Sequence, residues 1–593
     1  MDSTKDASTD GQEAGGHQGF AFRVTRLRVQ DGDWITLPRC GVTAVVGGNN
    51  VGKSTLLRQI VTYIGSDPSN PLAGPPLLAD MEQSREGSVQ DLVSWLAGHS
   101  GRTLSGNAEV FTRPGANALP VRDVATYWTD QHWAKRLSTL GNYFVQYADA
   151  QQRFQGVAPV ERRPDLTMPP SSPLHQIEDD PAKLLELSTI FEEAFGKPLL
   201  LDPLSGSLML RVGSPGVLAP PVDQVDVAYR EAVGQLPRID EQGDGMRSML
   251  GVLLPVTASA YPVIIVDEPE AFLHPPQARI LGKALGELAQ RSGVQVILAT
   301  HDRNILTGLL DAEKTEVTVV RLTRHENRTT ALQLDPAKLR AVWSNPALRY
   351  SNVLDGLFHR IVVLAENERD CRFYAASLDA AQRDGEVAIS PNDVLFVPTA
   401  GKANMKALAA ILVACGVPVV ACGDLDVLND EAVLRSLVEA LGGSWEPVRG
   451  SWFAATAEFR TEKVPRLNKD VATTIAGVLN AAPEDIYDAD MRKRITASLR
   501  VESPWHKLKD FGQRAFKAAP QAADTLLSYL DTQGVVLVRE GELEGFAPKL
   551  EVRKGLAWAE AAITAGAHEN AAAREHIIRI IASGLGIEAA AQA

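Results

Sequence analysis

Cysteines and long apolar runs are scarce in this chain. Only four cysteines occur in 593 residues, and no two of them form a CxxC pair. Scattered cysteines argue against a structural zinc site or a disulfide framework, and they suit a reducing cytosol. No apolar run is long enough to cross a membrane as a helix. We therefore expect a cytoplasmic protein without a membrane partner.

An excess of positive charge is also lacking. The formal net charge is −14 and the isoelectric point is about 5.4. This balance excludes a wholly basic protein that coats nucleic acid, but it does not exclude local basic patches, because recognition depends on how charge is distributed. Part of the acidity is compatible with carboxylates gathered around metal ions.

The length of the chain exceeds that of one ordinary domain, so we expect two large domains and an insertion. Residues 1–19 are polar and rich in Gly, Ser and Asp, and they lack the apolar stretch of a signal peptide. We expect this segment to be a disordered tail.

The motif GGNNVGKST lies between an apolar run, Val42–Val46, and a helix-like pattern, Leu56–Ile64. Strand, glycine-rich loop and helix form the context of a phosphate-binding loop. The glycines let backbone N–H groups point at phosphate oxygens, and the helix N-terminus adds positive partial charge. Lys53 would reach the β- and γ-phosphates of ATP, and Ser54 would ligate Mg²⁺. The predicted nucleotide-binding residues are Gly47, Asn49, Asn50, Gly52, Lys53, Ser54 and Thr55.

A second strand-like segment, Val263–Val266, ends in Asp267 and Glu268. Ligands of open α/β sheets bind at the carboxyl ends of the strands. Asp267 can hold the Mg²⁺ that Ser54 also touches, and Glu268 can polarise the attacking water. The next apolar strand leads to His301, which can sense the γ-phosphate and that water.

Together these motifs, and the spelling DEPEAFLHP in particular, resemble ABC-type ATPases of the SMC, RecF and OLD (overcoming lysogenization defect) kind over residues 20–325. The resemblance implies self-association, with ATP held between two heads and a signature loop offered to the partner's nucleotide. Glu241–Ser248 is the candidate loop, in which Gly243 and Gly245 would present N–H groups; Gln242 stands where the family usually has Ser. Three glutamines are candidates for a further Mg²⁺ contact: Gln59, Gln146 and Gln151.

Carboxylates also follow strand-like segments in the second half of the chain. Glu366 follows the apolar run Ile361–Leu364, and Asp370 lies four residues later in the first turn of an expected helix, which would put both on one face. A later strand ends in Asp424 and Asp426, whose i, i+2 spacing on an extended segment points them to one side. Because such carboxylates repel one another, we predict that they hold Mg²⁺, which can activate water for phosphodiester cleavage.

This order of acidic residues, with a glycine-bearing turn at Gly401, resembles the Toprim fold of topoisomerases, primases and OLD nucleases over residues 357–430. Toprim domains usually place Gly after the first Glu, where this chain has Asn367. The resemblance implies a nuclease site that takes Mg²⁺ or Mn²⁺, with Glu366 catalytic, and an acidic position and a lysine further along the chain. The candidates are Glu542 and Glu544 for the metal set, and Lys554, or alternatively Lys549, for the lysine; a solvated charged loop is the competing interpretation.

The expected fold class is therefore α/β: an ABC-type ATPase head over residues 20–345, with a helical and β insertion or dimerisation segment over about 65–235, followed by a Toprim domain with helical additions over 346–593. This arrangement is that of OLD proteins. The resemblance implies an ATP-regulated, Mg²⁺-dependent endonuclease that acts in anti-phage defence, alone or with a second defence protein. We favour DNA over RNA as the nucleic acid.

Three alternatives remain open. The protein can be a repair or recombination ATPase with a non-cleaving Toprim domain, or a defence effector that cleaves RNA such as tRNA. A topoisomerase or primase is the third, although neither a zinc module nor a tyrosine-bearing strand-passage domain is recognisable.

Basic residues gather between Arg492 and Lys517, with aromatic residues interleaved. Basic side chains can neutralise phosphates and aromatics can stack on unpaired bases. The competing interpretation is an amphipathic helix pair whose aromatics belong to the core. The basic members are Arg492, Lys493, Arg494, Arg500, Lys507, Lys509, Arg514 and Lys517, and the aromatic members are Trp505, Phe511 and Phe516.

Overall fold

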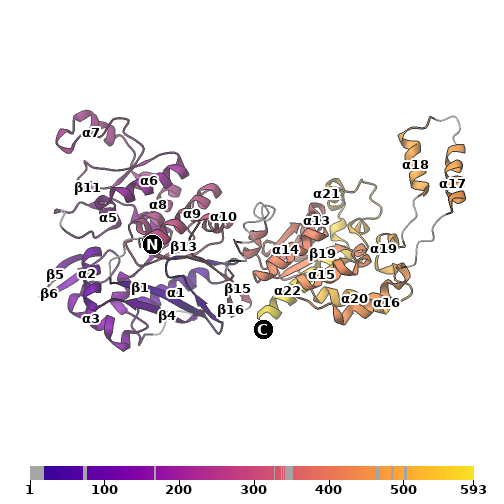
Figure 1. Cartoon of the computed structure of the whole chain (residues 1–593), viewed down its shortest axis with the longest axis horizontal. Coiled ribbons are helices and arrows are strands. Elements are labelled where there is room, and N and C mark those ends of the chain that lie inside the picture. The colour runs from indigo at the N-terminus through magenta and orange to yellow at the C-terminus, as the bar shows by residue number, and fades with distance from the viewer. Residues whose placement is uncertain are drawn as a thin grey trace, which may run out of the picture. The chain divides into compact units, whose positions relative to one another are not determined.

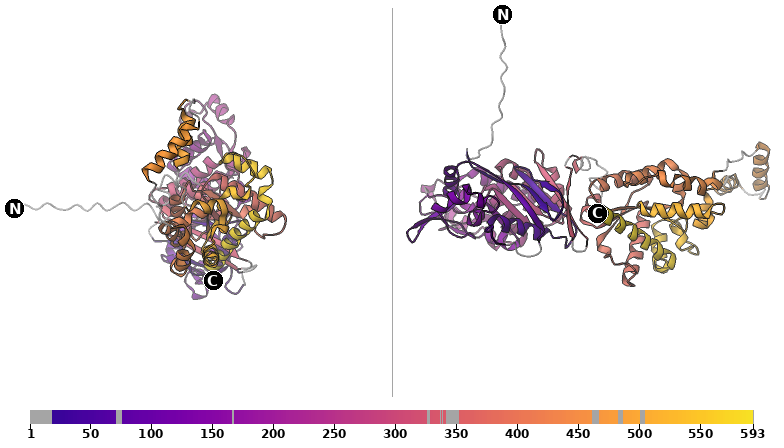
Figure 2. Two further views of the ribbon diagram at one scale, coloured as in Figure 1. Left: turned by 90° about the vertical axis from the view of Figure 1, so that its right-hand side faces the viewer. Right: turned by 90° about the horizontal axis from the view of Figure 1, so that it is seen from below.

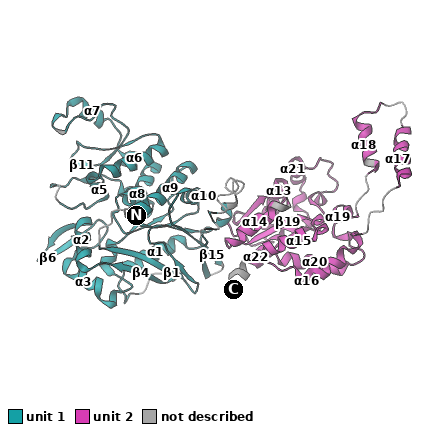
Figure 3. Ribbon diagram, in the orientation of Figure 1, with its two compact units in different colours: residues 1–358 teal, residues 359–593 magenta. Residues whose placement is uncertain are grey.

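The chain divides into two compact units, residues 1–358 and 359–593 (Figure 3). The computed structural model describes residues 19–592 except 71–75, 166–167, 326–327, 336, 338, 341–351, 461–466, 482–485 and 500–503. Almost all of the predicted tail and the predicted domain boundary at 345–346 lie outside the described residues. Each unit has a hydrophobic core of its own and a parallel sheet of its own (Figure 1).

The main sheet of the first unit has six strands in the order β16-β15-β3-β14-β13-β8. All neighbouring pairs are parallel except β15 and β16. The central strands are continuous apolar runs because helices cover both of their faces. The strands are β3 (Gly41–Val46), β8 (Val145–Ala148), β13 (Val263–Asp267), β14 (Gln295–Ala299), β15 (Val317–His325) and β16 (Arg328–Leu334).

A three-stranded antiparallel sheet, β2-β1-β4, lies beside this core, and the strands of the unit can be followed from below in Figure 2. Its strands are β1 (Ala21–Val29), β2 (Trp34–Thr36) and β4 (Leu78–Glu86). Alternate residues of β1 are buried, as expected for a strand with one covered face. A small sheet of β5 (Gly101–Ser105), β6 (Ala108–Thr112) and β7 (Leu119–Pro120) follows.

The segment 65–235 is not one insertion, contrary to the prediction. β4 pairs with β1, and β8 joins the main sheet beside β13, so both belong to the body of the unit. These strands were missed because β4 is largely polar and β8 has only four residues. Within this segment, β10 (Leu199–Leu201) pairs antiparallel with β12 (Leu210–Val212), and β11 (Ser207–Leu208) pairs with β9 (Val160–Glu161).

Helices surround the first sheet. The strand β13, which ends in Asp267 and is followed by Glu268, is called the acidic strand. The helices that position the nucleotide loop and this strand are α1 (Lys53–Gly65), α4 (Ala150–Gly156), α8 (Asp244–Thr257), α9 (Pro275–Ser292) and α10 (Arg303–Asp311). The others are α2 (Val89–His99), α3 (Val121–Thr129), α5 (Pro173–Asp179), α6 (Pro181–Phe195) and α7 (Val227–Gly234).

The second unit is built on a four-stranded, wholly parallel sheet in the order β18-β17-β19-β20. Its strands are β17 (Ile361–Ala365), β18 (Val394–Pro398), β19 (Val419–Asp424) and β20 (Val535–Val538). The first strand in sequence, β17, lies between the second and the third, so the direction of winding reverses there. Ligands of such sheets bind at this reversal, outside the carboxyl ends of the strands.

The helices of the second unit include α17 and α18, which pack on each other. The full set is α13 (Glu368–Arg383), α14 (Lys402–Ala414), α15 (Glu431–Ala440), α16 (Glu446–Thr456), α17 (Asn468–Asn480), α18 (Ala489–Leu499), α19 (His506–Phe511), α20 (Pro520–Thr532), α21 (Leu556–Thr564) and α22 (Ala571–Gln592). In the part of the chain that the structure describes, no helix combines the length and apolar character needed to cross a membrane.

Candidate functional site

The loop between β3 and α1 has the backbone of a phosphate cradle. Gly47 and Gly52 have φ of 145° and 100°, and Asn50 between them has φ of 63°. A Cβ at Gly47 would run into the carbonyl oxygen of Leu322, so only glycine fits there. Gly52 is the N-cap of α1, and no side chain of the described residues caps that helix, so its first N–H groups are available to an anion.

Lys53 and Ser54 are the first two residues of α1, and their side chains contact different parts of the site. Lys53 Nζ donates to the carbonyl oxygens of Gly47 and Gly48 at 2.9 and 2.8 Å. Ser54 Oγ donates to Asp267 Oδ1 at 3.0 Å, which joins the loop to the acidic strand 213 residues away. Burial lowers the pKa of Lys53, and nearby carboxylates, Glu268 foremost, oppose that shift.

Glu268 follows β13 in a backbone conformation that non-glycine residues rarely adopt, with φ of 48°. Its N–H donates to Ala299 O at 2.9 Å, which extends the pairing of β13 with β14 by one residue beyond the end of β13. The Glu268 side chain is 51% exposed and that of His301 is 49% exposed, and Glu268 Oε1 lies 3.6 Å from His301 Nδ1. Both predicted catalytic side chains of this unit therefore lie at one accessible edge of the sheet.

Two residues that the sequence did not single out contact Asp267. Tyr147, on β8, donates from its hydroxyl to Asp267 Oδ2 at 3.1 Å. Arg153, on α4, is 1% exposed and donates from Nη1 to the carbonyl oxygen of Asp267 at 2.6 Å. Neither lies near Asp267 in sequence, so only the pairing of β8 with β13 brings them together.

The three candidate glutamines have different environments. Gln59 is 5% exposed, and its Oε1 accepts from the N–H groups of Leu77 and Leu78, which is a structural role. Gln146 lies on β8, and side-chain alternation turns it to the face opposite its neighbour, which reaches Asp267. Gln151 is exposed in the first turn of α4.

The candidate signature loop leads directly into α8, whose N-cap is Gly243. No side chain caps this helix. A Cβ at Gly243 would meet nothing within 4 Å, whereas a Cβ at Gly245 would lie 2.7 Å from Phe272 O. Gly243 thus presents an open helix start, and Gly245 permits close packing of α8 on the segment that follows the acidic strand.

The carboxylates of the second unit lie at the carboxyl edge of its sheet. Glu366 follows β17 and Asp424 ends β19, on either side of the winding reversal. Burial raises the pKa of Asp424 to about 8, with Glu366, Asp370 and Asp426 adding to the shift. Burial also raises the pKa of Asp370 to about 6, against the attraction of Arg369. These shifts indicate carboxylates close enough to repel one another.

Two details of the acidic motifs differ from the predictions. α13 begins at Glu368, so Glu366 lies outside the helix and shares no helical face with Asp370; Asp370 instead caps the helix by accepting from the N–H of Asn367 at 2.8 Å. Asp426 lies in a short 3-10 helix, Leu425–Asn429, and not on an extended segment, because the chain turns immediately after β19.

Four of the six predicted metal ligands are paired with basic side chains, and one of them is Asp370, with Oδ1 at 3.6 Å from Arg369 Nε. Lys509 Nζ lies 2.9 Å from Asp426 Oδ2, Lys554 Nζ lies 2.5 Å from Glu542 Oε1, and Arg369 Nη1 lies 2.5 Å from Glu544 Oε1. Among the described residues, no three acidic, histidine or cysteine side chains are arranged to hold a metal ion. The six carboxylates therefore share one edge without forming a closed ligand set.

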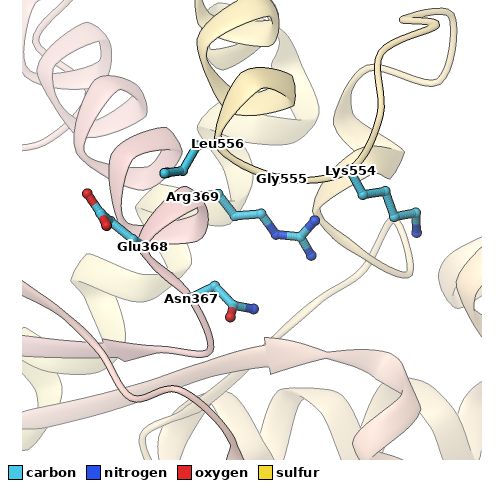
Figure 4. A pocket seen from close by; sticks show the side chains of 6 residues that line it. All are labelled: Asn367, Glu368, Arg369, Lys554, Gly555 and Leu556. Atoms are coloured by element: carbon cyan, nitrogen blue, oxygen red, sulfur yellow. The ribbon is translucent and has the colours of Figure 1, made fainter.

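A pocket of about 360 Å³ opens beside these pairs. Figure 4 shows the Arg369 guanidinium and the Lys554 amine extending to the same side, with Glu368 turned the other way. Glu368 pairs with Arg372 instead, at 2.6 Å. Gly555 also lines the pocket and is the N-cap of α21. No side chain of the described residues caps that helix. Two basic side chains, Arg369 and Lys554, thus line a pocket next to the carboxylates. Lys549, the alternative lysine, is not among the residues that line it.

The basic segment 492–517 is divided by the fold. Phe516 is 4% exposed and packs on Phe459 at 5.4 Å, so it belongs to the core, and Trp505, which is half-buried, packs on the same ring at 5.5 Å. Phe511 is 58% exposed. Of the basic residues, Lys509 reaches the acidic edge and Arg514 pairs with Glu540. The predicted Arg500 lies outside the described residues.

Comparison with known proteins agrees with the geometry of the first unit. Residues 228–307 match a family model described as "AAA domain, putative AbiEii toxin, Type IV TA system". That range contains α8, the acidic strand and His301. The first unit therefore contains an ATPase domain, which implies nucleotide binding.

A curated relative and several solved structures match parts of the chain at low sequence identity. An OLD nuclease of Thermus scotoductus is 25% identical over 222 residues, which cover 35% of this chain and 40% of that protein. Two solved structures are each 13% identical: an Smc head domain bound to the C-terminal domain of ScpA, from Pyrococcus furiosus (TM-score 0.32, 54% of this chain and 98% of that one), and the SMC head domain from Thermotoga maritima (TM-score 0.26, 53% and 99%). Likenesses with such low TM-scores add nothing to the fold described above.

Proposed function

We propose that this chain is an ATP-regulated, Mg²⁺-dependent endonuclease of the OLD type that acts on nucleic acid in anti-phage defence. The observation that carries the proposal is the gathering of Glu366, Asp370 and Asp424 at the winding reversal of a parallel sheet, where burial, with repulsion from the other two carboxylates added to it, raises the pKa of Asp424 to about 8. The partial identity to an OLD nuclease supports the same activity.

The residues at this edge suit a hard divalent cation. All six candidate ligands are carboxylates, the donors that Mg²⁺ and Mn²⁺ prefer. The Oε1 atom of Glu366 is buried and accepts no hydrogen bond from the residues that the structure describes. A bound Mg²⁺ would supply an activated water and stabilise the leaving oxygen of a phosphodiester. Glu366, Asp370, Asp424 and Asp426 would hold it, with Glu542 or Glu544 completing the set.

The basic side chains of the same edge have a role toward substrate. Arg369 and Lys554 line the pocket. In this structure Arg369 pairs with Glu544, and Lys554 pairs with Glu542. If those carboxylates turn to a cation, both basic groups are released toward a phosphate of the nucleic acid, where Lys554 would stabilise the charge that develops during cleavage. The exposed lysines and arginines of α18 and α19 would hold the flanking backbone.

The ATPase domain would regulate access to this site. Lys53, Ser54 and Asp267 would hold ATP and its Mg²⁺, while Glu268 and His301 would support hydrolysis. Two heads would associate around the nucleotide, each offering the start of α8 to the other.

Nicking of supercoiled plasmid by the purified full chain tests the proposal. We expect cleavage that requires Mg²⁺ or Mn²⁺ and is abolished by Glu366→Ala, while ATP binding survives. Asp379→Ala is the matched control, because that carboxylate is exposed on α13 and is not among the residues that line the pocket. Cleavage retained in full by Glu366→Ala would sink the nuclease assignment.

Two alternatives give different results in the same assay. A repair ATPase with a non-cleaving second unit would bind plasmid without nicking it under any divalent ion. An RNA-directed effector would leave plasmid intact and cleave tRNA or other RNA, so the assay includes both polymers.

A further inference from the structure

Glu270 is a buried carboxylate at the ATPase site that has no role in the proposed mechanism. It lies on the turn after β13 and is 6% exposed. Its Oε1 accepts from the N–H of His301 at 2.9 Å and lies 3.1 Å from Nδ1 of the same residue. One carboxylate oxygen therefore holds both the backbone and the imidazole of His301.

The closeness of Glu270 Oε1 to Nδ1, at 3.1 Å, favours a proton on that ring nitrogen. When Nδ1 carries a proton and donates it to Glu270, Nε2 is the nitrogen left for a ligand. Glu268, by contrast, is half exposed and lies further from Nδ1, at 3.6 Å. Glu268 thus remains accessible to water while Glu270 holds the ring.

Arg153 attracts the buried carboxylate of Glu270, although burial still leaves the pKa of Glu270 raised. A carboxylate in a buried position requires a partner charge to remain ionised. Arg153 is 1% exposed, and Glu270 is the carboxylate that most opposes the lowering of its pKa by burial. Glu270 Oε2 and Arg153 Nη2 are both buried without a hydrogen bond to any described residue, so their interaction is electrostatic. Arg153 also holds the carbonyl of Asp267, which ties this charge to the acidic strand.

We infer that Glu270 is a positioning residue for ATP hydrolysis: it fixes the orientation and tautomer of His301 so that Nε2 faces the γ-phosphate. Glu270 itself touches no reacting atom. The inference rests on the proposed roles of His301 and Glu268.

A double-mutant cycle tests the inference with the full chain. Glu270→Ala and Glu270→Gln are made alone and together with His301→Ala, and kcat and KM for ATP are measured for each. We expect His301→Ala and Glu270→Ala each to lower kcat by about tenfold or more, with KM changed by less than about threefold. Once His301 is absent, Glu270→Ala should have almost no further effect. Glu270→Gln has the same shape and retains an acceptor, so its loss should be smaller.

The alternatives give distinguishable results. If Glu270→Ala lowers kcat by the same factor with and without His301, the residue acts independently of the imidazole and the positioning role is overturned, while the ATPase assignment stands. If His301→Ala leaves kcat unchanged, there is nothing for Glu270 to position and the inference also fails. Direct binding of a fluorescent ATP analogue and the melting temperature of Glu270→Gln separate these outcomes from a folding defect. A wild-type chain that hydrolyses no ATP would overturn the inference together with the proposed ATPase roles, whereas plasmid nicking reports on the nuclease separately.

Discussion

Single residues at the acidic edge serve local structure and candidate chemistry together. Asp370 caps α13, and the same carboxylate is one of the group that contributes to the raised pKa of Asp424. The sequence pattern placed Glu366 and Asp424 at strand ends, as the structure has them, because apolar runs followed by acidic residues are local signals. It could not identify Arg369, Lys509 or Arg153 as partners, because those contacts join segments that only the fold brings together.

At the residue scale, the shifted pKa of Asp424 predicts how the metal-free protein responds to pH. The pKa rises from 3.8 in the unfolded chain to about 8 in the folded one, mainly through burial. Between these values the folded state keeps a proton that the unfolded state releases, so stability falls as pH rises from about 4 to 8. Asp424→Asn removes the charge, and the variant should lose less stability over this range.

Melting temperatures in EDTA at pH 6 and pH 8.5 measure this effect. Wild type should lose at least about 3 °C more than Asp424→Asn between the two conditions. Asp510→Asn, at an exposed site on α19, is the control and should behave as wild type. Added Mg²⁺ should raise the melting temperature of wild type at pH 8.5 but not that of Asp424→Asn. Equal pH dependence of all three proteins would contradict the coupling of these carboxylates.

At the scale of elements, the parallel strands around the nucleotide loop could be predicted, whereas β4 and β8 could not. Val263–Asp267 and Gln295–Ala299 are uninterrupted apolar runs with an acidic or polar end, which is a strong pattern. β8 has four residues, VQYA, and its identity as a strand depends on its pairing with β13. The missed strand matters for the candidate site, because β8 leads into α4 and thereby brings Arg153 to the carbonyl oxygen of Asp267.

The contact between α4 and α8 gives a prediction about packing. A Cβ on Gly251, in α8, would overlap the backbone of Arg153 in α4. Gly251→Ala should therefore force the helices apart, and we expect a loss of about 1–3 kcal/mol in the free energy of unfolding. Arg153 would shift with α4, so ATPase activity should fall as well.

Gly234→Ala is the matched control for this substitution. Gly234 ends α7, and a Cβ there would meet nothing within 4 Å. Its replacement should be neutral or slightly stabilising, because alanine restricts the unfolded chain. Urea denaturation of both variants measures the difference. A Gly251→Ala protein as stable as the control would show that the two helices separate without cost.

At the scale of the whole molecule, the two units have separate cores, and the ATPase unit presents an open helix start at Gly243. In the proposed association of two heads, such a helix start would attract the phosphates of the nucleotide bound to the second copy. A head that binds ATP without hydrolysing it should therefore accumulate as a dimer. Glu268→Gln provides this state, because the amide removes the charge that would polarise water while the side chain keeps its shape.

Light scattering after size-exclusion chromatography measures the association. Glu268→Gln should show an about twofold rise in mass when ATP and Mg²⁺ are added, relative to its nucleotide-free form. The double variant Lys53→Ala/Glu268→Gln should show no rise, because the lysine that would hold the β- and γ-phosphates is missing. Gly243→Asp in the Glu268→Gln background should also prevent the rise, since its carboxylate would cap α8 and repel the partner's nucleotide, while leaving ATP binding by its own loop intact. If Gly243→Asp associates as readily as its parent, the contact between heads does not run through α8.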